Sequence, residues 1–256
     1  MNLDYQTMIR IFSQVVWPLG RIGGLMLAVP VFSSNLIPAR IKIVFVLALS
    51  WVCSPAVPQQ LSFLDFNGVY IVYLVQELFL GLLMGFTLQM VFQIFVLGGQ
   101  IISMQSGLGF AVMIDPASRA SVPLVSQLFL MMTTLIFLSL NGHLAILDAL
   151  LNSFKLMPIG QAPIDNTMVW QVIIFSGWMF KEAVLISIPA ILSLLIVSLA
   201  FGIMARAAPQ LNIFSLGFPI TLIMAMLIIK ISLPSVGRQI AENVEYGMQF
   251  IIGMLR

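Results

Sequence analysis

Charged residues are scarce in this sequence of 256 residues: they make up 8% of it, against roughly a quarter in soluble domains. Hydrophobic residues make up 61%, and the mean hydropathy is +1.10. This balance excludes an ordinary soluble domain. Because the long apolar runs lack the two-residue alternation of a transmembrane barrel, they predict an all-α integral membrane protein.

Residues that carry redox or metal chemistry are nearly absent. Cys53 is the one cysteine, so no disulfide can form within the chain, and we expect a small buried hydrophobe there. His143 is the one histidine. With no second histidine and no neighbouring cysteine, it predicts a hydrogen-bonded structural residue at a helix junction rather than a metal ligand.

Catalytic patterns are missing as well. The sequence has no phosphate-binding glycine loop, no metal-ligand cluster and no Ser, His and Asp at a catalytic spacing, so we expect neither an enzyme nor a cofactor. The net charge of +2, with single scattered basic residues, argues against nucleic acid. A secondary transporter is an alternative, but no internal repeat is visible. After these exclusions, the remaining functional class is a channel or scaffold subunit.

The apolar residues gather into six runs, at 11–32, 41–57, 69–97 with a continuation to Gln105, 124–140, 168–204 and 213–233. Pro18 and Pro30 are expected to break the first run, and the second is too short for a comfortable span. Asn141 and Gly142 tolerate left-handed backbone geometry, so they predict a helix end and a new helix starting at an angle from His143. The tail at 235–256 has an amphipathic helical pattern.

Two features of the runs are unusual in lipid. Arg21 lies between Gly20 and Gly24, a pair that allows close helix approach, so it should face protein, water or a headgroup, or snorkel from a helix end. In the third run, small and polar residues recur every four positions and form a stripe. This stripe predicts a helix-packing seam or the wet wall of a pore, and it comprises Glu77, Gly81, Gly85, Gln89 and Gln93.

The last two runs predict a long antiparallel hairpin that reverses at 206–212. Lys181 and Glu182 lie near the middle of the fifth run and, as neighbours, point about 100° apart on a helix. Folding the runs together places Glu182 within about one turn of Lys230, which predicts an ion pair across the hairpin. The alternative is that each charge snorkels or meets another subunit.

The segment at 98–123 is rich in glycine, contains two prolines and carries only Asp115 and Arg119 as charges. Gly98 and Gly99 predict a helix break, residues 107–113 a mobile part, and residues 115–123 an anchored return. We expect a flexible segment that lines or closes a passage.

Several short patterns, taken in order, resemble the FliR family of the bacterial flagellar type III export gate over essentially the full length. The related SctT subunit of virulence secretion systems is the alternative. The patterns are RIGGLMLAVPVF from Arg21, GGQIISMQSGLGFA from Gly98, Asp115-Pro116, Asn141-Gly142-His143, Lys181-Glu182, and RAAPQLN from Arg206, which contains Pro209, Gln210 and Asn212.

The resemblance implies a location in the bacterial inner membrane, in the flagellar basal body. It implies partners: FliP and FliQ homologues, which form the gate with this chain, the attached FlhB and FlhA, and unfolded flagellar proteins as the exported substrates. It further implies a FliP-like portion at 1–167 and a FliQ-like hairpin at 168–256.

The resemblance also implies that a loop at 107–121 points into the channel as a plug, within the wider segment at 98–123. Apolar side chains would block the passage, glycines would allow the loop to swing aside, and an Asp-Pro pair would fix the end of the mobile part. The residues concerned are Gly107, Gly109, Phe110, Met113, Asp115 and Pro116.

Overall fold

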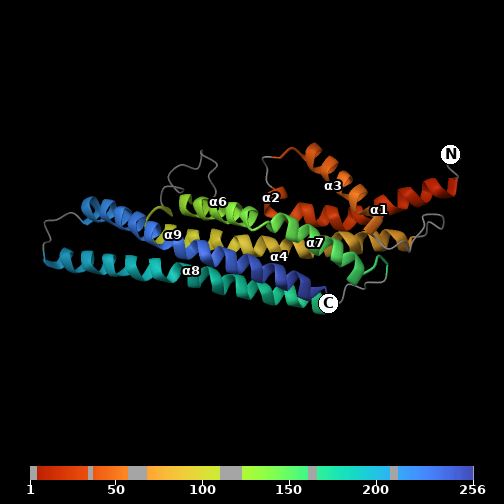
Figure 1. Cartoon of the computed structure of the whole chain (residues 1–256). Coiled ribbons are helices and arrows are strands. Elements are labelled where there is room, and N and C mark those ends of the chain that lie inside the picture. Colours follow the sequence, from red (N-terminus) through yellow and green to blue (C-terminus); the bar gives the residue numbers. More distant parts are fainter. Residues whose placement is uncertain are drawn as a thin grey trace. The chain divides into compact units, whose positions relative to one another are not determined.

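A computed structural model describes residues 5–33, 37–56, 68–109, 123–160, 166–207 and 213–255. Within these ranges the chain forms helices and no strand, which confirms the predicted all-α fold (Figure 1). In chain order the elements are α1 (Tyr5–Ala28), α2 (Pro30–Ser33), α3 (Ala39–Cys53), the 3-10 turn η1 (Ser54–Ala56), α4 (Val69–Gln105), α6 (Leu124–Ser139), α7 (Gly142–Leu156), α8 (Asn166–Ala207) and α9 (Ile213–Met254).

The chain divides into two compact units. The first comprises Met1–Met90, Asn141–Phe175 and Val244–Arg256, and the second comprises Val91–Leu140 and Ser176–Asn243. The helices α4, α8 and α9 each contribute residues to both units. This division reflects compactness within the chain, whereas the boundary predicted after residue 167 reflects resemblance to other subunits, so that boundary stays a prediction.

Three of the described helices are long and apolar enough to cross a membrane: α4, the part of α8 at Asn166–Met204 and the part of α9 at Pro219–Met254. The bent pair α6 and α7 is a fourth candidate if it acts as one span. Both α8 and α9 have 42 residues, so each is about 63 Å long, roughly twice the hydrocarbon core. The 15 residues of α3 reach only about 22 Å.

Two predicted helix breaks are wrong. Pro18 lies inside α1, where it is buried, and packing there outweighs the hydrogen bond that proline removes. Gly98 and Gly99 lie inside α4, so the glycine-rich segment begins in a helix. A Cβ built on Gly99 would lie 2.6 Å from the Cα of Ser126, so this glycine permits a close approach of α4 and α6.

The predicted helix junction is confirmed. Asn141 has φ 56° and ψ 28°, the left-handed conformation, and it is the one described non-glycine residue with positive φ. Its carbonyl accepts hydrogen bonds from the backbone N–H groups of Leu144 and Ala145, which begin α7. α6 and α7 form a bent pair at this point, as expected.

The amphipathic tail is confirmed too, because α9 continues without a break to Met254. Its predicted apolar positions are buried, and Arg238, Glu242 and Glu245 are exposed. Asn243 differs from the prediction, since it is buried rather than on an outer face. The buried apolar positions are Val236, Ile240, Val244, Met248, Ile251 and Leu255.

Candidate functional site

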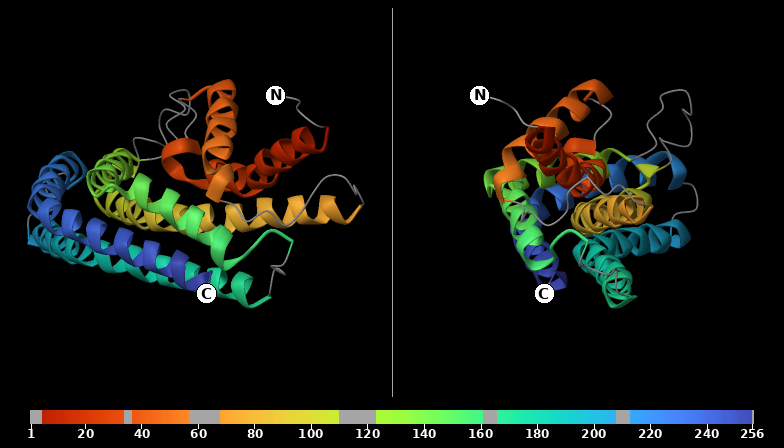
Figure 2. Two further views of the ribbon diagram at one scale, coloured as in Figure 1. Left: turned by 45° about the vertical axis from the view of Figure 1, so that its right-hand side comes forward. Right: turned by 90° about the vertical axis from the view of Figure 1, so that its right-hand side faces the viewer.

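Glycines bring α1 and α4 into backbone contact within the first unit. A Cβ on Gly24 would collide with the carbonyl oxygen of Leu78, and a Cβ on Gly81 would collide with the carbonyl oxygen of Arg21. Small residues at such positions allow two helices to pack closely without any group large enough to separate them. Both views of Figure 2 show α1 beside the first part of α4. The same close contact is made by Gly20 and Gly85.

This close crossing encloses a charged pair. The guanidinium of Arg21 donates from Nε to Glu77 Oε2 at 2.7 Å and from Nη2 to Glu77 Oε1 at 3.0 Å. Both side chains are buried, with 0% of Arg21 and 2% of Glu77 exposed. A bidentate arrangement is the strongest form of this contact, and it keeps each buried charge paired. Arg21 therefore faces protein and does not snorkel.

α7 completes the surroundings of the guanidinium. Arg21 Nη1 donates to Ser153 Oγ at 2.9 Å, and Nη2 donates to the carbonyl of Met157 at 2.9 Å. The Arg21 Cζ atom lies 4.4 Å from the centre of the Phe154 ring, a cation–π contact. Ser153 Oγ in turn donates to the carbonyl of Leu150 at 2.6 Å. One arginine thus links α1, α4 and the end of α7.

The predicted stripe on α4 divides into two parts. Glu77, Gly81 and Gly85 contact α1, so their geometry is that of a packing seam. Gln89 is exposed and Gln93 is half-buried. Only the later part of the stripe is therefore in a position to face water or another protein.

Gln89 borders an open apolar hollow of about 400 Å³ on the first unit. Its other lining residues come from the end of α1 and from α4, and Phe86 and Leu27 are exposed, at 49% and 64%. The hollow is lined by Leu27, Ala28, Phe79, Leu82, Leu83, Phe86 and Gln89.

The structure describes the beginning of the segment expected to be a plug. α4 ends at Gln105, and Gly107 has φ 82°, a backbone conformation that side-chain-bearing residues rarely adopt. Ser106 Oγ donates to the carbonyl of Ser103 at 3.0 Å and closes the turn. Gly109 is half-buried. Phe110, Met113, Asp115 and Pro116 lie outside the described residues.

The predicted ion pair of Glu182 with Lys230 is not formed within the described part of the chain. Glu182 Oε1 lies instead 3.8 Å from Nζ of Lys181, and Lys230 is exposed. Neighbouring side chains diverge at their Cβ atoms, but a lysine at a helix surface is long enough to bend toward the adjacent carboxylate. Such a partly exposed pair contributes little stability.

Other predicted positions fall at the ends of helices. Arg206 is exposed in the last turn of α8, whereas Pro209, Gln210 and Asn212 lie outside the described residues. His143 is at the predicted junction, after Asn141 and Gly142. Its Nδ1 is buried and has no hydrogen-bond partner among the described residues, so the expected hydrogen bond is absent there. No metal-binding group of side chains occurs in those residues either.

Ser153 and Met157 are the partners of Arg21 that the sequence did not indicate. They lie 132 and 136 residues after the arginine, and no spacing or periodicity connects them to it. A buried arginine does signal that several acceptors must surround it. It does not say where in the chain they are.

These features define a class: a polytopic α-helical membrane protein, with long apolar helices and a buried charge pair at a close helix crossing. The chain belongs to the family described as bacterial export proteins, family 1, whose model matches residues 12–246. This family membership confirms the bacterial export protein that the resemblance predicts.

Curated relatives agree with this family. The chain is 32% identical to the flagellar biosynthetic protein FliR of Escherichia coli (strain K12), over 85% of this chain and 83% of the relative. It is 32% identical to FliR of Pectobacterium carotovorum subsp. carotovorum, over 89% and 87%. It is 31% identical to FliR of Bacillus subtilis (strain 168), over 82% of both chains.

Proposed function

We propose that this chain is a subunit of the flagellar type III export gate in the bacterial inner membrane, at the flagellar basal body. With FliP and FliQ homologues it forms the channel through which unfolded flagellar proteins leave the cytoplasm, and FlhB and FlhA attach to this assembly. The observation that carries the proposal is the family match, which extends over nearly the whole chain.

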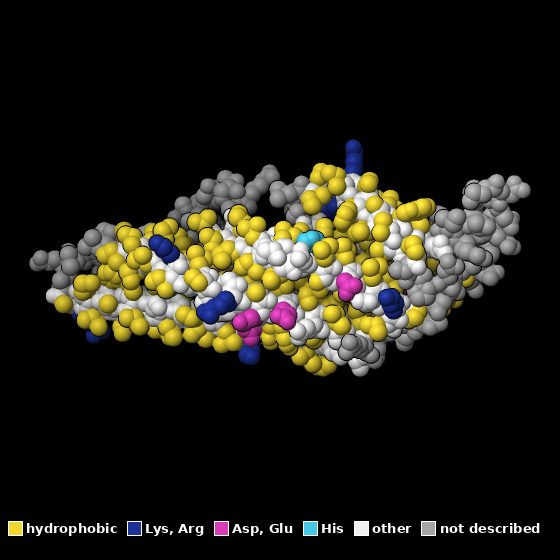
Figure 3. Space-filling view, viewed as in Figure 1, with side chains coloured by type: hydrophobic (Ala, Val, Ile, Leu, Met, Phe, Trp, Pro, Cys, Tyr) yellow, Lys and Arg dark blue, Asp and Glu magenta, His cyan; other side chains and the backbone are white. Residues whose placement is uncertain are grey.

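The surfaces of α8 and α9 support a partnered state. Of the most apolar part of each span, 72% is buried within the chain for α4, but only 22% for α8 and 11% for α9. Lys181 is 68% exposed within its span, and Lys230 is exposed as well. Lipid tails disfavour an ammonium group, so these faces need water or protein beside them. Figure 3 shows charged side chains standing singly or in small groups on a largely hydrophobic face.

The portion at 168–256 acts as a FliQ-like hairpin, and the portion at 1–167 is FliP-like. Two helices of 42 residues each, α8 and α9, support the hairpin assignment. The Phe175 ring stacks 6.2 Å from Tyr246 and lies 4.3 Å from Phe250, centre to centre. These contacts bring the start of α8 to the end of α9, as an antiparallel hairpin requires.

The loop at 107–121 closes the channel as a plug until a substrate arrives. Phe110 and Met113 supply adaptable apolar blocking groups, and Gly107 and Gly109 supply backbone freedom. The end of α4 at Gln105 and the left-handed Gly107 support a change of backbone direction at the start of this loop. Asp115 and Pro116 fix the end of the mobile part of this loop.

Copurification tests the proposal. The tagged full-length chain, expressed with its FliP and FliQ homologues, should elute with both in one complex that resists stringent washing. The matched control is the same expression with the SctT homologue of a virulence system in its place, which should not join the flagellar partners. Failure to copurify, together with saturable uptake of a small solute by the chain reconstituted alone, would support a secondary transporter instead.

A further inference from the structure

A pocket lies where α1, α2 and α3 meet, in the first unit. It has a volume of about 170 Å³ and is lined by Met26, Phe32, Ile37, Ile41, Lys42 and Phe45. The Phe32 and Phe45 rings stack at a centroid distance of 5.6 Å. An apolar cavity of about 150 Å³ holds one benzene-sized group, so this pocket takes about six carbon atoms. That is a segment of a hydrocarbon chain rather than a whole cofactor.

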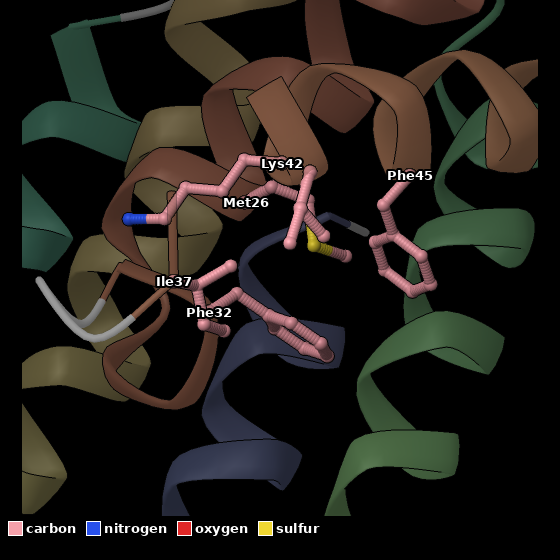
Figure 4. Close-up of a pocket in the computed structure, with 6 residues that line it drawn as sticks. Met26, Phe32, Ile37, Lys42 and Phe45 are labelled. Atoms are coloured by element: carbon pink, nitrogen blue, oxygen red, sulfur yellow. The ribbon is translucent and has the colours of Figure 1, made fainter. Parts of the chain in front are cut away.

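Lys42 makes the pocket amphipathic. Its Nζ donates to the backbone carbonyl of Ser33 at 3.1 Å, which holds the ammonium near the end of α2. Figure 4 shows this nitrogen at one end of the lining side chains and the Phe45 ring at the other. A ligand that fits must therefore join an apolar chain to a group that suits a positive charge.

The segment that supplies most of the pocket lining carries charges of one sign. Between residues 30 and 56 the sequence contains two charged residues, Arg40 and Lys42, and no acidic residue. Arg40 is exposed two positions before Lys42. The ammonium of Lys42 attracts an anionic group that lies near it. An anionic headgroup is favoured over a zwitterionic one.

The surface of α3 indicates where the ligand comes from. The helix is too short to span a bilayer, yet it exposes Ile43, Val44, Trp51 and Val52 at 60%, 65%, 62% and 71%. A basic first turn followed by exposed apolar residues is typical of a helix that lies at the boundary between headgroups and acyl chains. At that depth both halves of a phospholipid are within reach of the pocket.

We propose that this pocket binds an anionic phospholipid, with a segment of one acyl chain against Met26, Phe32 and Phe45 and the headgroup phosphate beside Lys42. The proposal concerns α1 to α3 and is independent of the role of the loop at 107–121. It adds a specific lipid site to the gate subunit proposed above.

Native mass spectrometry of the full-length chain tests the site. The chain is released into mild detergent from nanodiscs of equal parts phosphatidylglycerol and phosphatidylcholine, and the retained lipids are counted. The expected preference for phosphatidylglycerol is about fivefold, which corresponds to one basic residue near a headgroup. Lys42→Gln should abolish the preference and Lys42→Arg should keep it. Lys155→Gln, an exposed lysine on α7, is the matched control and should keep it.

A second pair of variants tests the apolar part. Ile41→Trp places a large ring at the pocket, and Ile43→Trp makes the same change at a similarly exposed residue of the same helix that does not line it. Retention of both lipids should fall in Ile41→Trp and not in Ile43→Trp. If Ile41→Trp fails to fold by circular dichroism, the Lys42 variants decide the question alone.

Three results would overturn the site. Unchanged lipid preference in Lys42→Gln would remove the role of the ammonium. Displacement of the lipid by inorganic phosphate alone would show that a free anion, and not a phospholipid, is bound. Cross-linking of the Ile41→Cys variant at that position to a copurified export subunit, with no retained phosphatidylglycerol, would show that a protein covers the pocket.

Discussion

Arg21 and Glu77 form a bidentate ion pair, with N–O distances of 2.7 and 3.0 Å, between residues that are 56 positions apart. The pair lies where α1 and α4 are close enough for glycine to be required on both helices. Each partner thus neutralises a charge that the crossing would otherwise bury alone. The crossing and the pair depend on one another.

We expect the two residues to be strongly coupled. Glu77→Leu or Arg21→Met alone should lower the free energy of unfolding by about 3–5 kcal/mol, because each leaves an unpaired buried charge. The double variant should lose clearly less than the sum, since no buried charge remains. A double-mutant cycle on the purified full-length chain, unfolded by denaturant in detergent, measures this. Additive losses would mean that the pair contributes no coupling.

The glycines at the crossing should be sensitive to a single methyl group. Gly81→Ala places a Cβ against the Arg21 carbonyl and should destabilise the chain by about 1–3 kcal/mol through overpacking. Gly23→Ala is the control, because a Cβ there meets nothing within 4 Å. It should be neutral or stabilising by up to about 1 kcal/mol through helix propensity. Equal thermal shifts for the two variants would rule out a close crossing.

Deletion of residues 107–117 tests the plug directly. The gate should still assemble with its FliP and FliQ homologues, but cells should become permeable to small solutes, because the blocking side chains are gone. Permeability is measured by dye uptake and assembly by copurification. Normal assembly with unchanged permeability would mean that this loop is not a plug.

Two glycine variants separate a role of the loop from the effect of local backbone strain, with the same permeability assay. Gly107 and Gly160 both have left-handed backbones, with φ 82° and 77°. Alanine at either position strains the backbone by about 1–2 kcal/mol. Gly107→Ala should change permeability because it lies in the loop, and Gly160→Ala should not.

Charge exchange distinguishes the observed contact of Glu182 from the expected one. Because Glu182 pairs with Lys181, adding Glu182→Lys to Lys230→Glu should not restore whatever assembly Lys230→Glu loses. The yield of complex with the FliP homologue is the readout. Rescue by the double variant would reinstate an ion pair across the hairpin.

Features governed by neighbouring residues were predictable from the sequence. The start of α4 at Val69, the left-handed Asn141 and the buried positions of the tail all follow from apolar periodicity or from local backbone preference. The family was predictable as well, because the FliR-like patterns are short and occur in a fixed order along the chain.

Features that depend on residues far apart in the chain were not predictable from the sequence. Gly98 and Gly99 have the composition of a break, yet both lie inside α4, and Gly99 lies where α6 approaches closely. The acceptors of Arg21 on α7 lie more than a hundred positions away, so no window of sequence contains both. Glu182 contacts the adjacent Lys181, whereas the position of the reversal between the two helices predicted Lys230.

The position of Glu77 in the chain also imposes a delay during synthesis. Arg21 leaves the ribosome 56 residues before Glu77, an interval of about 3 to 11 s at 5–20 residues per second. Throughout that time α1 carries a guanidinium with no counter-charge of its own. α1 therefore stays in water or beside another protein until α4 has been synthesised. Its final position is reached when Arg21 pairs with Glu77.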